Sequence, residues 1–168
     1  MPKALVTDDR GSWLVRGVEL LRDGGCGRIT VVLGAEAVQA MSLLVDLEVD
    51  VAVADDWAEG MGASLRTGLR SLDGSGDDGV VLTLVDLPDL VPDVVTRVIA
   101  AADGPAALAR AAYDGRPGHP VLLGRDHWAG VIETAVGDQG ARAYLADRDV
   151  TLVECADLAT GRDVDFHS

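Results

Sequence analysis

Apolar positions follow two alternating spacings along the chain, and these spacings predict helices and strands in turn. Leu14, Val18 and Leu21 recur at i, i+4 and i+7, the spacing of one helix face, and Gly24-Gly25 provides the helix end. The continuous apolar run 29–33 that follows is typical of a buried strand. Further along, the pattern predicts helices over 36–44, 65–72, 94–102, 128–136 and near 140, and strands over 49–54, 80–85, 107–113, 120–123 and 151–155.

Strands that alternate with helices predict a three-layer α/β fold. The run 80–85 is the best candidate for its central strand, because it is apolar on both faces, rich in β-branched residues and bounded by glycine and proline. The polar, glycine-rich segment 73–79 is a surface loop that is too short to link two domains. The sequence holds no internal repeat, so we expect residues 1–168 to form a single domain.

The composition agrees with a layered fold and limits the partners. Of the 168 residues, 48% are hydrophobic but only 4% are aromatic, so the core has to be built from aliphatic side chains, as in helix-covered sheets. A formal net charge of -14 would repel phosphate backbones and anionic lipids over most of the surface. We therefore expect no nucleic-acid partner and no membrane partner, and an anionic small substrate would need a local cation.

The two cysteines and the N-terminal segment point to the cytoplasm. Cys26 and Cys155 are too few and too far apart for a disulfide framework, and neither has a neighbour at metal-ligand spacing. We expect both to be buried as small hydrophobic residues. The chain shows no signal-peptide apolar region and no apolar run of the roughly 18 residues that a membrane span needs. These features predict a soluble cytoplasmic protein.

Acidic residues occur where an α/β sheet gathers its ligands, at the carboxyl ends of strands. Asp86 directly follows the predicted central strand, and a carboxylate fixed there can hold Mg²⁺ through its hard oxygen atoms. Asp163 and Asp165 lie two residues apart on the same side of an extended segment, and either could complete a metal site. The alternatives are a turn aspartate at 86 and a solvated acidic tail at 163–165.

The segment 59–64 joins a predicted strand to a predicted helix and is rich in small residues. Gly60 and Gly62 would let the backbone come close to a flat ligand, and the hydroxyl of Ser64 can donate or accept a hydrogen bond. The alternative is a helix start with flanking glycines.

Three cationic or titratable side chains are candidates for contacts with an anion. Lys3 is the only lysine among 14 lysines and arginines, and its place beside a proline suggests a specific role; the alternative is a disordered N-terminal residue. His119 lies between glycine and proline, where a histidine is more often a turn residue than a catalyst. Arg142 follows the segment 138–141, which fits a capped helix start as well as an anion site.

Several segments together resemble one family. In chain order they are PKALV, VVLG, WAEGMGASLRTGL, LTLVDLPDL, YDGRPGHPVLLGRDHW, GDQGARAYL and RDVD. They are similar to the molybdenum cofactor cytidylyltransferases of the MobA-like NTP transferase family, and the resemblance covers nearly the whole chain. It implies a Rossmann-like, three-layer mixed sheet with helices on both faces, of the type found in nucleotide-diphospho-sugar transferases.

The resemblance implies transfer of CMP from CTP to the terminal phosphate of a molybdenum-pterin cofactor, with release of pyrophosphate. It assigns Asp86 to Mg²⁺, Lys3 to the triphosphate and the segment 60–64 to the nucleotide base. His119 would lie near the pterin phosphate or the metal, and the acidic pair at 163–165 would supply a second carboxylate. A molybdoenzyme or its maturation factor would receive the product. In such a site, metal and lysine offset phosphate charge while positioning supplies in-line attack.

The resemblance also has a gap. The family's LAAGxGxR segment, which forms the first strand and a phosphate-binding loop, does not precede Met1. Without that strand, two strand edges in the middle of the sheet would be unpaired. We therefore expect the natural chain to extend upstream, with Met1 as an internal methionine, and we expect weak or no transfer by residues 1–168 alone.

Two further interpretations are open. A guanylyltransferase, or a transferase that acts on another phosphorylated alcohol, would need only a few different contacts to the base. An accessory protein could keep the scaffold without the catalytic loop, and it would bind nucleotide or cofactor without releasing pyrophosphate.

Overall fold

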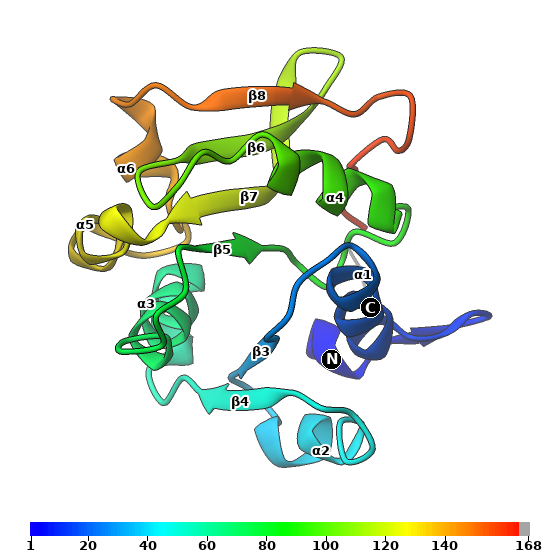
Figure 1. Ribbon diagram of the computed structural model, residues 1–168. Helices are drawn as coiled ribbons and strands as arrows, with labels where there is room; N and C mark the ends of the chain where they lie inside the picture. Colours follow the sequence, from blue (N-terminus) through cyan, green and yellow to red (C-terminus); the bar gives the residue numbers. More distant parts are fainter. Residues whose placement is uncertain (165–168) are drawn as a thin grey trace.

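The computed structural model describes residues 1–164 of the chain (Figure 1). The helices are α1 (Trp13–Asp23), α2 (Ala37–Ser42), α3 (Met61–Ser71), α4 (Pro92–Ala100), α5 (Trp128–Thr134) and α6 (Arg142–Ala146). The strands are β1 (Thr7–Asp8), β2 (Gly11–Ser12), β3 (Thr30–Leu33), β4 (Asp50–Val53), β5 (Gly79–Leu82), β6 (Leu108–Tyr113), β7 (Arg116–Gly124) and β8 (Thr151–Glu154). Short 3-10 turns are η1 (Lys3–Leu5), η2 (Trp57–Glu59) and η3 (Arg125–His127). The predicted α/β alternation is confirmed.

Local chemistry explains where two of the helices begin and end. The Ser12 hydroxyl accepts a hydrogen bond from the amide of Val15 at 3.2 Å and so caps α1. Gly25, with a φ of 112°, follows the end of the same helix. Pro92 opens α4, at a position where its missing amide hydrogen leaves no helical hydrogen bond unmade.

Hydrogen bonds divide the strands into three sheets. β1 and β2 form a small hairpin that the sequence did not predict, β3 pairs with β4 in parallel, and the remaining strands form a mixed sheet in the order β5-β7-β6-β8. The β6–β7 hairpin turns on Asp114 and Gly115, whose φ angles of 54° and 80° suit a type I′ turn. Because this turn is tight, β7 begins at Arg116, earlier than the predicted strand 120–123.

The strand predicted over 80–85 is shorter than its apolar run. β5 ends at Leu82, which pairs with Val121 on β7, and residues 83–85 continue outside the strand. The next residue on β7 is Pro120, which has no amide hydrogen to donate, so the ladder stops there. β5 also forms an edge of the mixed sheet. The prediction of a central strand is therefore wrong for the hydrogen-bonded sheet.

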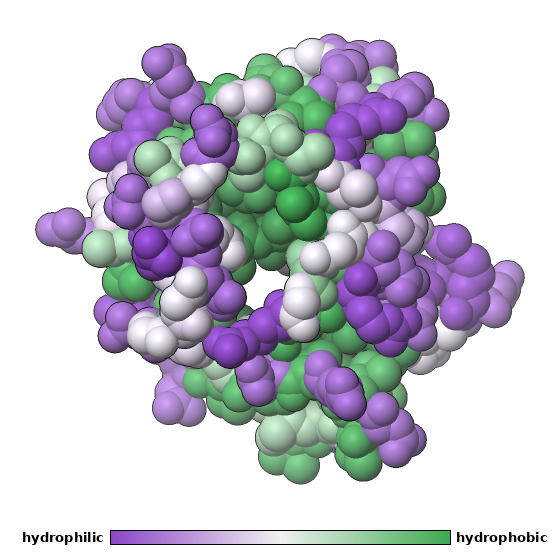
Figure 2. All heavy atoms as spheres, in the orientation of Figure 1, coloured by the Kyte–Doolittle hydropathy of each residue, from purple (hydrophilic) through white to green (hydrophobic). Residues whose placement is uncertain are grey.

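Beside the open edge of β5 lies the β3–β4 pair, which is not hydrogen-bonded to it (Figure 1). Figure 2 shows an opening at the centre of the same view, between the part of the surface around β5 and the part around β3. The backbone groups on these two facing edges find no partner in the other sheet.

Helices cover both faces of the mixed sheet. On one face α3, α5 and α6 pack around a core that includes Leu69, Leu123 and Val131. On the other face α4 packs through Val94 and Val98. A third core joins α1, α2 and β3. These cores are mainly aliphatic, as the composition predicted.

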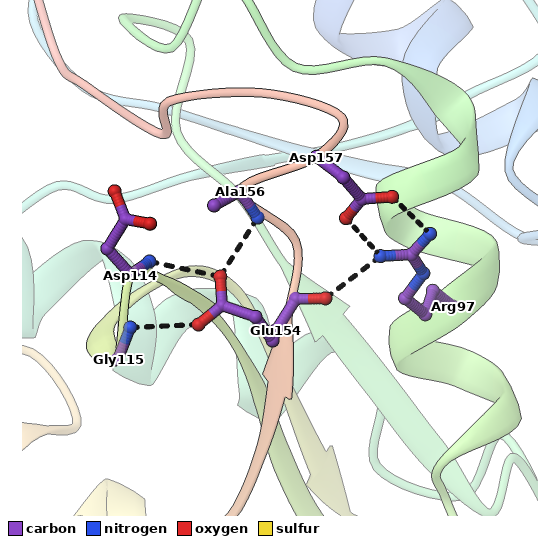
Figure 3. Close-up of polar contacts among 6 residues, drawn as sticks. All are labelled: Arg97, Asp114, Gly115, Glu154, Ala156 and Asp157. Atoms are coloured by element: carbon purple, nitrogen blue, oxygen red, sulfur yellow. Dashed lines mark hydrogen bonds and ion pairs between the residues drawn. The ribbon is translucent and has the colours of Figure 1, made fainter.

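The end of β8 is tied to its surroundings by charged side chains (Figure 3). The Glu154 carboxylate accepts hydrogen bonds from the backbone of the β6–β7 turn and of Ala156, at 2.8 to 3.0 Å. Arg97 of α4 forms a two-point ion pair with Asp157, at 2.7 and 3.0 Å. These contacts fix the start of the segment that follows β8.

Two smaller predictions need correction. α5 ends at Thr134, and Val136 is 60% exposed, so the helix predicted over 128–136 is too long. Cys155 is buried, but Cys26 is only half-buried, and both are free thiols.

No helix within residues 1–164 is long and apolar enough to cross a membrane.

Candidate active site

Asp86 and Lys3 form an ion pair just beyond the carboxyl end of β5. Asp86 is only 5% exposed. Nζ of Lys3 lies 2.6 Å from Oδ2 of Asp86, and the lysine side chain is 41% exposed. A buried carboxylate needs a charge partner and hydrogen bonds, and the single lysine supplies both from the other end of the sequence. Two of the predicted site residues are thus brought together.

The segment that carries Asp163 runs beside Asp86. The amide of Val164 donates a hydrogen bond to the backbone oxygen of Asp86 at 2.9 Å. Just before it, Asp89 accepts hydrogen bonds from the amide and the hydroxyl of Thr160, at 2.6 Å each. Asp163 therefore lies near Asp86, whereas Asp165 lies outside the described residues.

The donors at this point fit a divalent cation that prefers oxygen ligands. Asp86 and Asp163 can offer carboxylate oxygens, and the ammonium of Lys3 already shows that the Asp86 carboxylate accepts a cation. Within residues 1–164, no group of three or more His, Cys, Asp or Glu side chains is arranged to hold a metal ion. A cation held by two carboxylates would keep positions for phosphate oxygens, which is how Mg²⁺ commonly binds.

A cleft of about 390 Å³ lies between the end of β3 and the start of α3, within the size range of small-molecule sites. It is lined by Pro2, Ala4, residues 32–35, Trp57, Gly60, Met61, Ser64 and Asp138. Pro2 and Ala4 flank Lys3, whose amino group reaches Asp86. The cleft and the acidic centre are therefore adjacent.

The structure separates the residues predicted in the segment 60–64. Gly60 and Ser64 line the cleft, whereas Gly62 is buried behind it. The amide of Gly62 donates to the carbonyl of Gly137 at 2.8 Å, and a Cβ added to Gly62 would meet the backbone of 135–137 at 3.0 to 3.1 Å. Gly62 thus permits close packing of α3 on that backbone, and its contact with a nucleotide stays a prediction.

Two cleft residues were missed by the sequence reasoning. Trp57 on η2 is 48% exposed, and its Cβ packs against Gly34 at the end of β3. An exposed indole beside a cleft can stack on a flat base. Asp138 lies against Gly60 and does not cap α6, whose N-cap residue is Ala141. The available signal for Trp57 was its rarity, because the chain has only three tryptophans and this one follows two aspartates.

His119 lies inside β7 and precedes a cis peptide bond to Pro120, so the interpretation as a turn residue is wrong. The Tyr113 hydroxyl donates a hydrogen bond to the backbone oxygen of His119 at 2.6 Å. Burial lowers the pKa of His119, the charge of Arg110 lowers it further, and Asp86 opposes both. The imidazole is therefore neutral at pH 7 and within electrostatic reach of Asp86.

Comparison with known proteins identifies the family of this fold. Residues 1–152 match the family described as the MobA-like NTP transferase domain. The chain belongs to this family. It is 35% identical over 175 residues to nicotine blue oxidoreductase of Paenarthrobacter nicotinovorans, and the match covers 98% of this chain and 83% of that protein.

Solved structures support the same fold. The Rv0371c homologue from Mycobacterium sp. strain JC1 superposes with a TM-score of 0.81 at 24% identity, over 98% of this chain and 82% of that one. Rv0371c of Mycobacterium tuberculosis, in a complex with manganese, gives a TM-score of 0.76 at 23% identity, over 92% and 81% of the two chains.

Family membership confirms the predicted enzyme class. The chain is a nucleotidyltransferase, and its family acts on nucleoside triphosphates. Its mixed α/β fold is the one that the sequence predicted.

Proposed function

We propose that the protein transfers CMP from CTP to the phosphate of a molybdenum-pterin cofactor and releases pyrophosphate, with Mg²⁺ as the metal. One observation carries this proposal: Lys3 stands between two residues of the cleft and pairs with the buried carboxylate of Asp86. A triphosphate that follows this path would have its base in the cleft and its phosphates at the acidic centre. The likeness of the quoted sequence segments to cytidylyltransferases supports the choice of CTP and of the acceptor.

Each side chain then has a defined task. The base would lie beside Gly60, Ser64 and Trp57, where the hydroxyl can bond to its edge and the indole can stack on its face. Lys3 would move from Asp86 to the triphosphate as Asp86 and Asp163, with Asp165, take up Mg²⁺. The metal, when bound, supplies charge neutralisation on the phosphate oxygens.

The reaction needs no covalent intermediate with the protein. An oxygen of the acceptor phosphate forms a new bond to the α-phosphorus of CTP, and the bond from that phosphorus to the bridging oxygen breaks, so that pyrophosphate leaves with the electron pair. Neutral His119 can accept a hydrogen bond from a protonated acceptor phosphate without adding charge. Lys3 would then offset the charge that accumulates on the leaving group.

The proposal also includes a compartment, a domain organisation and a recipient for the product. We place the reaction in the cytoplasm, with residues 1–168 acting as one domain. The product would pass to a molybdoenzyme or its maturation factor. A guanylyl transfer is the nearest alternative, because the described cleft holds few groups that could distinguish one base from another.

The direct test is release of labelled pyrophosphate from CTP in the presence of Mg²⁺ and molybdenum cofactor, with GTP in a parallel reaction. Asp86→Asn should lower the rate at least about 100-fold, because the isosteric amide cannot hold the metal's charge. Asp126→Asn, an exposed aspartate without a side-chain partner in the described chain, is the matched control and should keep the rate. Equal, measurable rates in the Asp86→Asn and wild-type proteins would overturn the proposal, and CTP binding without release would favour the accessory-protein alternative.

A second candidate function comes from the 35% identity to nicotine blue oxidoreductase, which extends over 98% of this chain. It would be reduction of an aromatic heterocycle bound in the cleft beside Trp57. Loss of the visible colour of nicotine blue in the presence of a reduced nicotinamide nucleotide would support it. A colour that persists while pyrophosphate is released would favour the transferase.

A further inference from the structure

Two arginines, one on β6 of the mixed sheet and one at the start of α6, form no ion pair with Asp or Glu among residues 1–164. In residues 1–164, ion pairs with Asp or Glu are formed by Arg16, Arg22, Arg28, Arg66, Arg97 and Arg125. Arg110 and Arg142 form none there. The only side-chain hydrogen bond of Arg110 in this range runs from Nε to the backbone oxygen of Gly118, at 3.1 Å. Five further arginines also form no ion pair in this range, but all five are exposed, whereas Arg110 is half-buried.

Strand register places Arg110 on the face of the sheet that α6 covers. Arg110 and Leu82 both pair with Val121, so the three side chains share one face. Leu82 and Val121 belong to the core under α3, α5 and α6. Ala141, which precedes Arg142, packs against the same core. Arg110 on β6 and Arg142 at the start of α6 therefore lie on the same side of the sheet.

The pKa of Arg110 agrees with this placement. Burial lowers the pKa of Arg110, and the charge of Arg142 lowers it further. Because like charges repel, this arrangement is unfavourable unless a negative group lies between them. The half-buried position of Arg110 strengthens the repulsion, since fewer waters screen it.

His119 links this pair to the acidic centre. It lies in the stretch of β7 where the register with β6 shifts, next to Arg110 and Ala112 of β6. Burial lowers its pKa, and the charge of Arg110 lowers it further. The nearby carboxylate of Asp86 acts in the opposite direction and raises this pKa. The neutral imidazole is thus within electrostatic reach of both Arg110 and the carboxylate that would hold the metal.

We propose that Arg110 and Arg142 bind the phosphate group of the acceptor substrate and hold it toward Asp86. Two planar guanidinium groups can each form paired hydrogen bonds with a phosphate, and a dianion between them removes their mutual repulsion. This inference rests on the proposed transfer to a phosphorylated acceptor and adds which residues recognise that acceptor. The nucleotide would be held separately, by Lys3 and the cleft.

The test titrates inorganic phosphate into the metal-free and nucleotide-free protein at constant ionic strength, by calorimetry and by NMR of the arginine side-chain Nε–H signals. Wild type should show saturable binding that shifts the signals of Arg110 and Arg142. Arg142→Gln, at an exposed position where folding is not at risk, should weaken phosphate binding at least about tenfold, the affinity change for about 1.4 kcal/mol. Arg110→Lys, which keeps the charge but loses the paired geometry, should weaken it by a smaller factor.

Arg116→Gln is the matched control, because Arg116 is exposed on the same hairpin and forms no ion pair within the described chain. It should change phosphate affinity less than twofold. Equal phosphate affinity in Arg142→Gln and wild type, or absence of saturable binding by wild type, would overturn the inference. So would an equal loss of CTP and phosphate affinity in Arg142→Gln, because the arginines would then belong to the nucleotide site. If phosphate binding depends on both arginines but no nucleotide is transferred, the proposed function fails and the phosphate site remains.

Discussion

The amino group of Lys3 and the carboxylate of Asp86 meet at 2.6 Å although 83 positions separate them in the sequence. This contact holds the N-terminal turn η1 against the end of β5 and joins the cleft to the acidic centre. It gives the only lysine of the chain a structural partner before any substrate binds.

Lys3→Met should destabilise the fold and weaken nucleotide binding. Removal of the ammonium leaves the buried Asp86 carboxylate without its cation, which we expect to cost about 1–2 kcal/mol, less than for a fully buried pair because Lys3 is 41% exposed. Urea unfolding measures the loss. Lys3→Arg keeps the charge and should retain most of the stability; an unfolding midpoint unchanged in Lys3→Met would contradict this account.

Trp57→Ala should weaken nucleotide binding without unfolding the protein. The indole is 48% exposed at the cleft, so its loss removes a stacking surface worth about 1–3 kcal/mol, or roughly tenfold or more in affinity. Fluorescence titration with CTP in the Trp57→Phe and Trp57→Ala proteins gives the comparison, because phenylalanine keeps a smaller stacking face. Identical affinities in the two variants would place the base elsewhere.

Gly62→Ala should destabilise the protein by about 1–3 kcal/mol. The added methyl group would meet backbone atoms of residues 135–137 at 3.0 to 3.1 Å, and backbone cannot move aside as a side chain can. Gly17→Ala in α1 is the matched control, since its methyl group has nothing within 4 Å. That change should stabilise the helix by about 0.5–1 kcal/mol. Thermal unfolding of both variants tests the contrast, and equal shifts would refute it.

Glu154→Gln should lower stability at neutral pH but not in acid. Hydrogen bonds from the backbone of Gly115, Ala156 and Asp114 hold the pKa of Glu154 below its usual value (Figure 3). A carboxyl group whose pKa is lower in the folded state stabilises the fold at any pH above its unfolded-state pKa of about 4.3. This stabilisation is lost as the pH falls through the folded-state pKa. The difference between Glu154→Gln and wild type should therefore shrink below about pH 4.

Glu133→Gln serves as the control for that experiment, because Glu133 is exposed and has no side-chain partner among residues 1–164. Its unfolding midpoint should follow that of wild type at every pH. A Glu154→Gln deficit that stays constant from pH 7 to the acid range would show that lost packing, and not charge, is responsible.

An apolar strand supplied ahead of Met1 should stabilise the protein. β3 and β5 present facing edges that are not hydrogen-bonded to each other, beside the opening in Figure 2. Fusion of a strand-forming segment of alternating Val and Ile should add at least about 1 kcal/mol, which corresponds to about 2–4 °C in Tm. A fusion of equal length built from Gly and Ser is the control, and equal Tm values for the two would show that the edges take no strand.

The sequence by itself determined the elements and the position of one site residue. The i, i+4, i+7 spacing of Leu14, Val18 and Leu21 sufficed for α1, because a helix forms from residues close in the chain. The apolar run that ends before Asp86 likewise indicated a strand with a carboxylate beyond it. Such patterns depend only on residues close together in the sequence, so they can be recognised without knowledge of the tertiary contacts.

Only the tertiary structure decided which elements meet. β5 stops at Leu82 because Pro120 follows on the neighbouring strand. β5 is an edge strand because only one of its sides is hydrogen-bonded to another strand. The approach of Lys3 and Val164 to Asp86 and the packing role of Gly62 also depend on contacts between distant segments. Hydrogen bonding and close packing act through space, and spacing along a single sequence does not encode which remote surfaces will face each other.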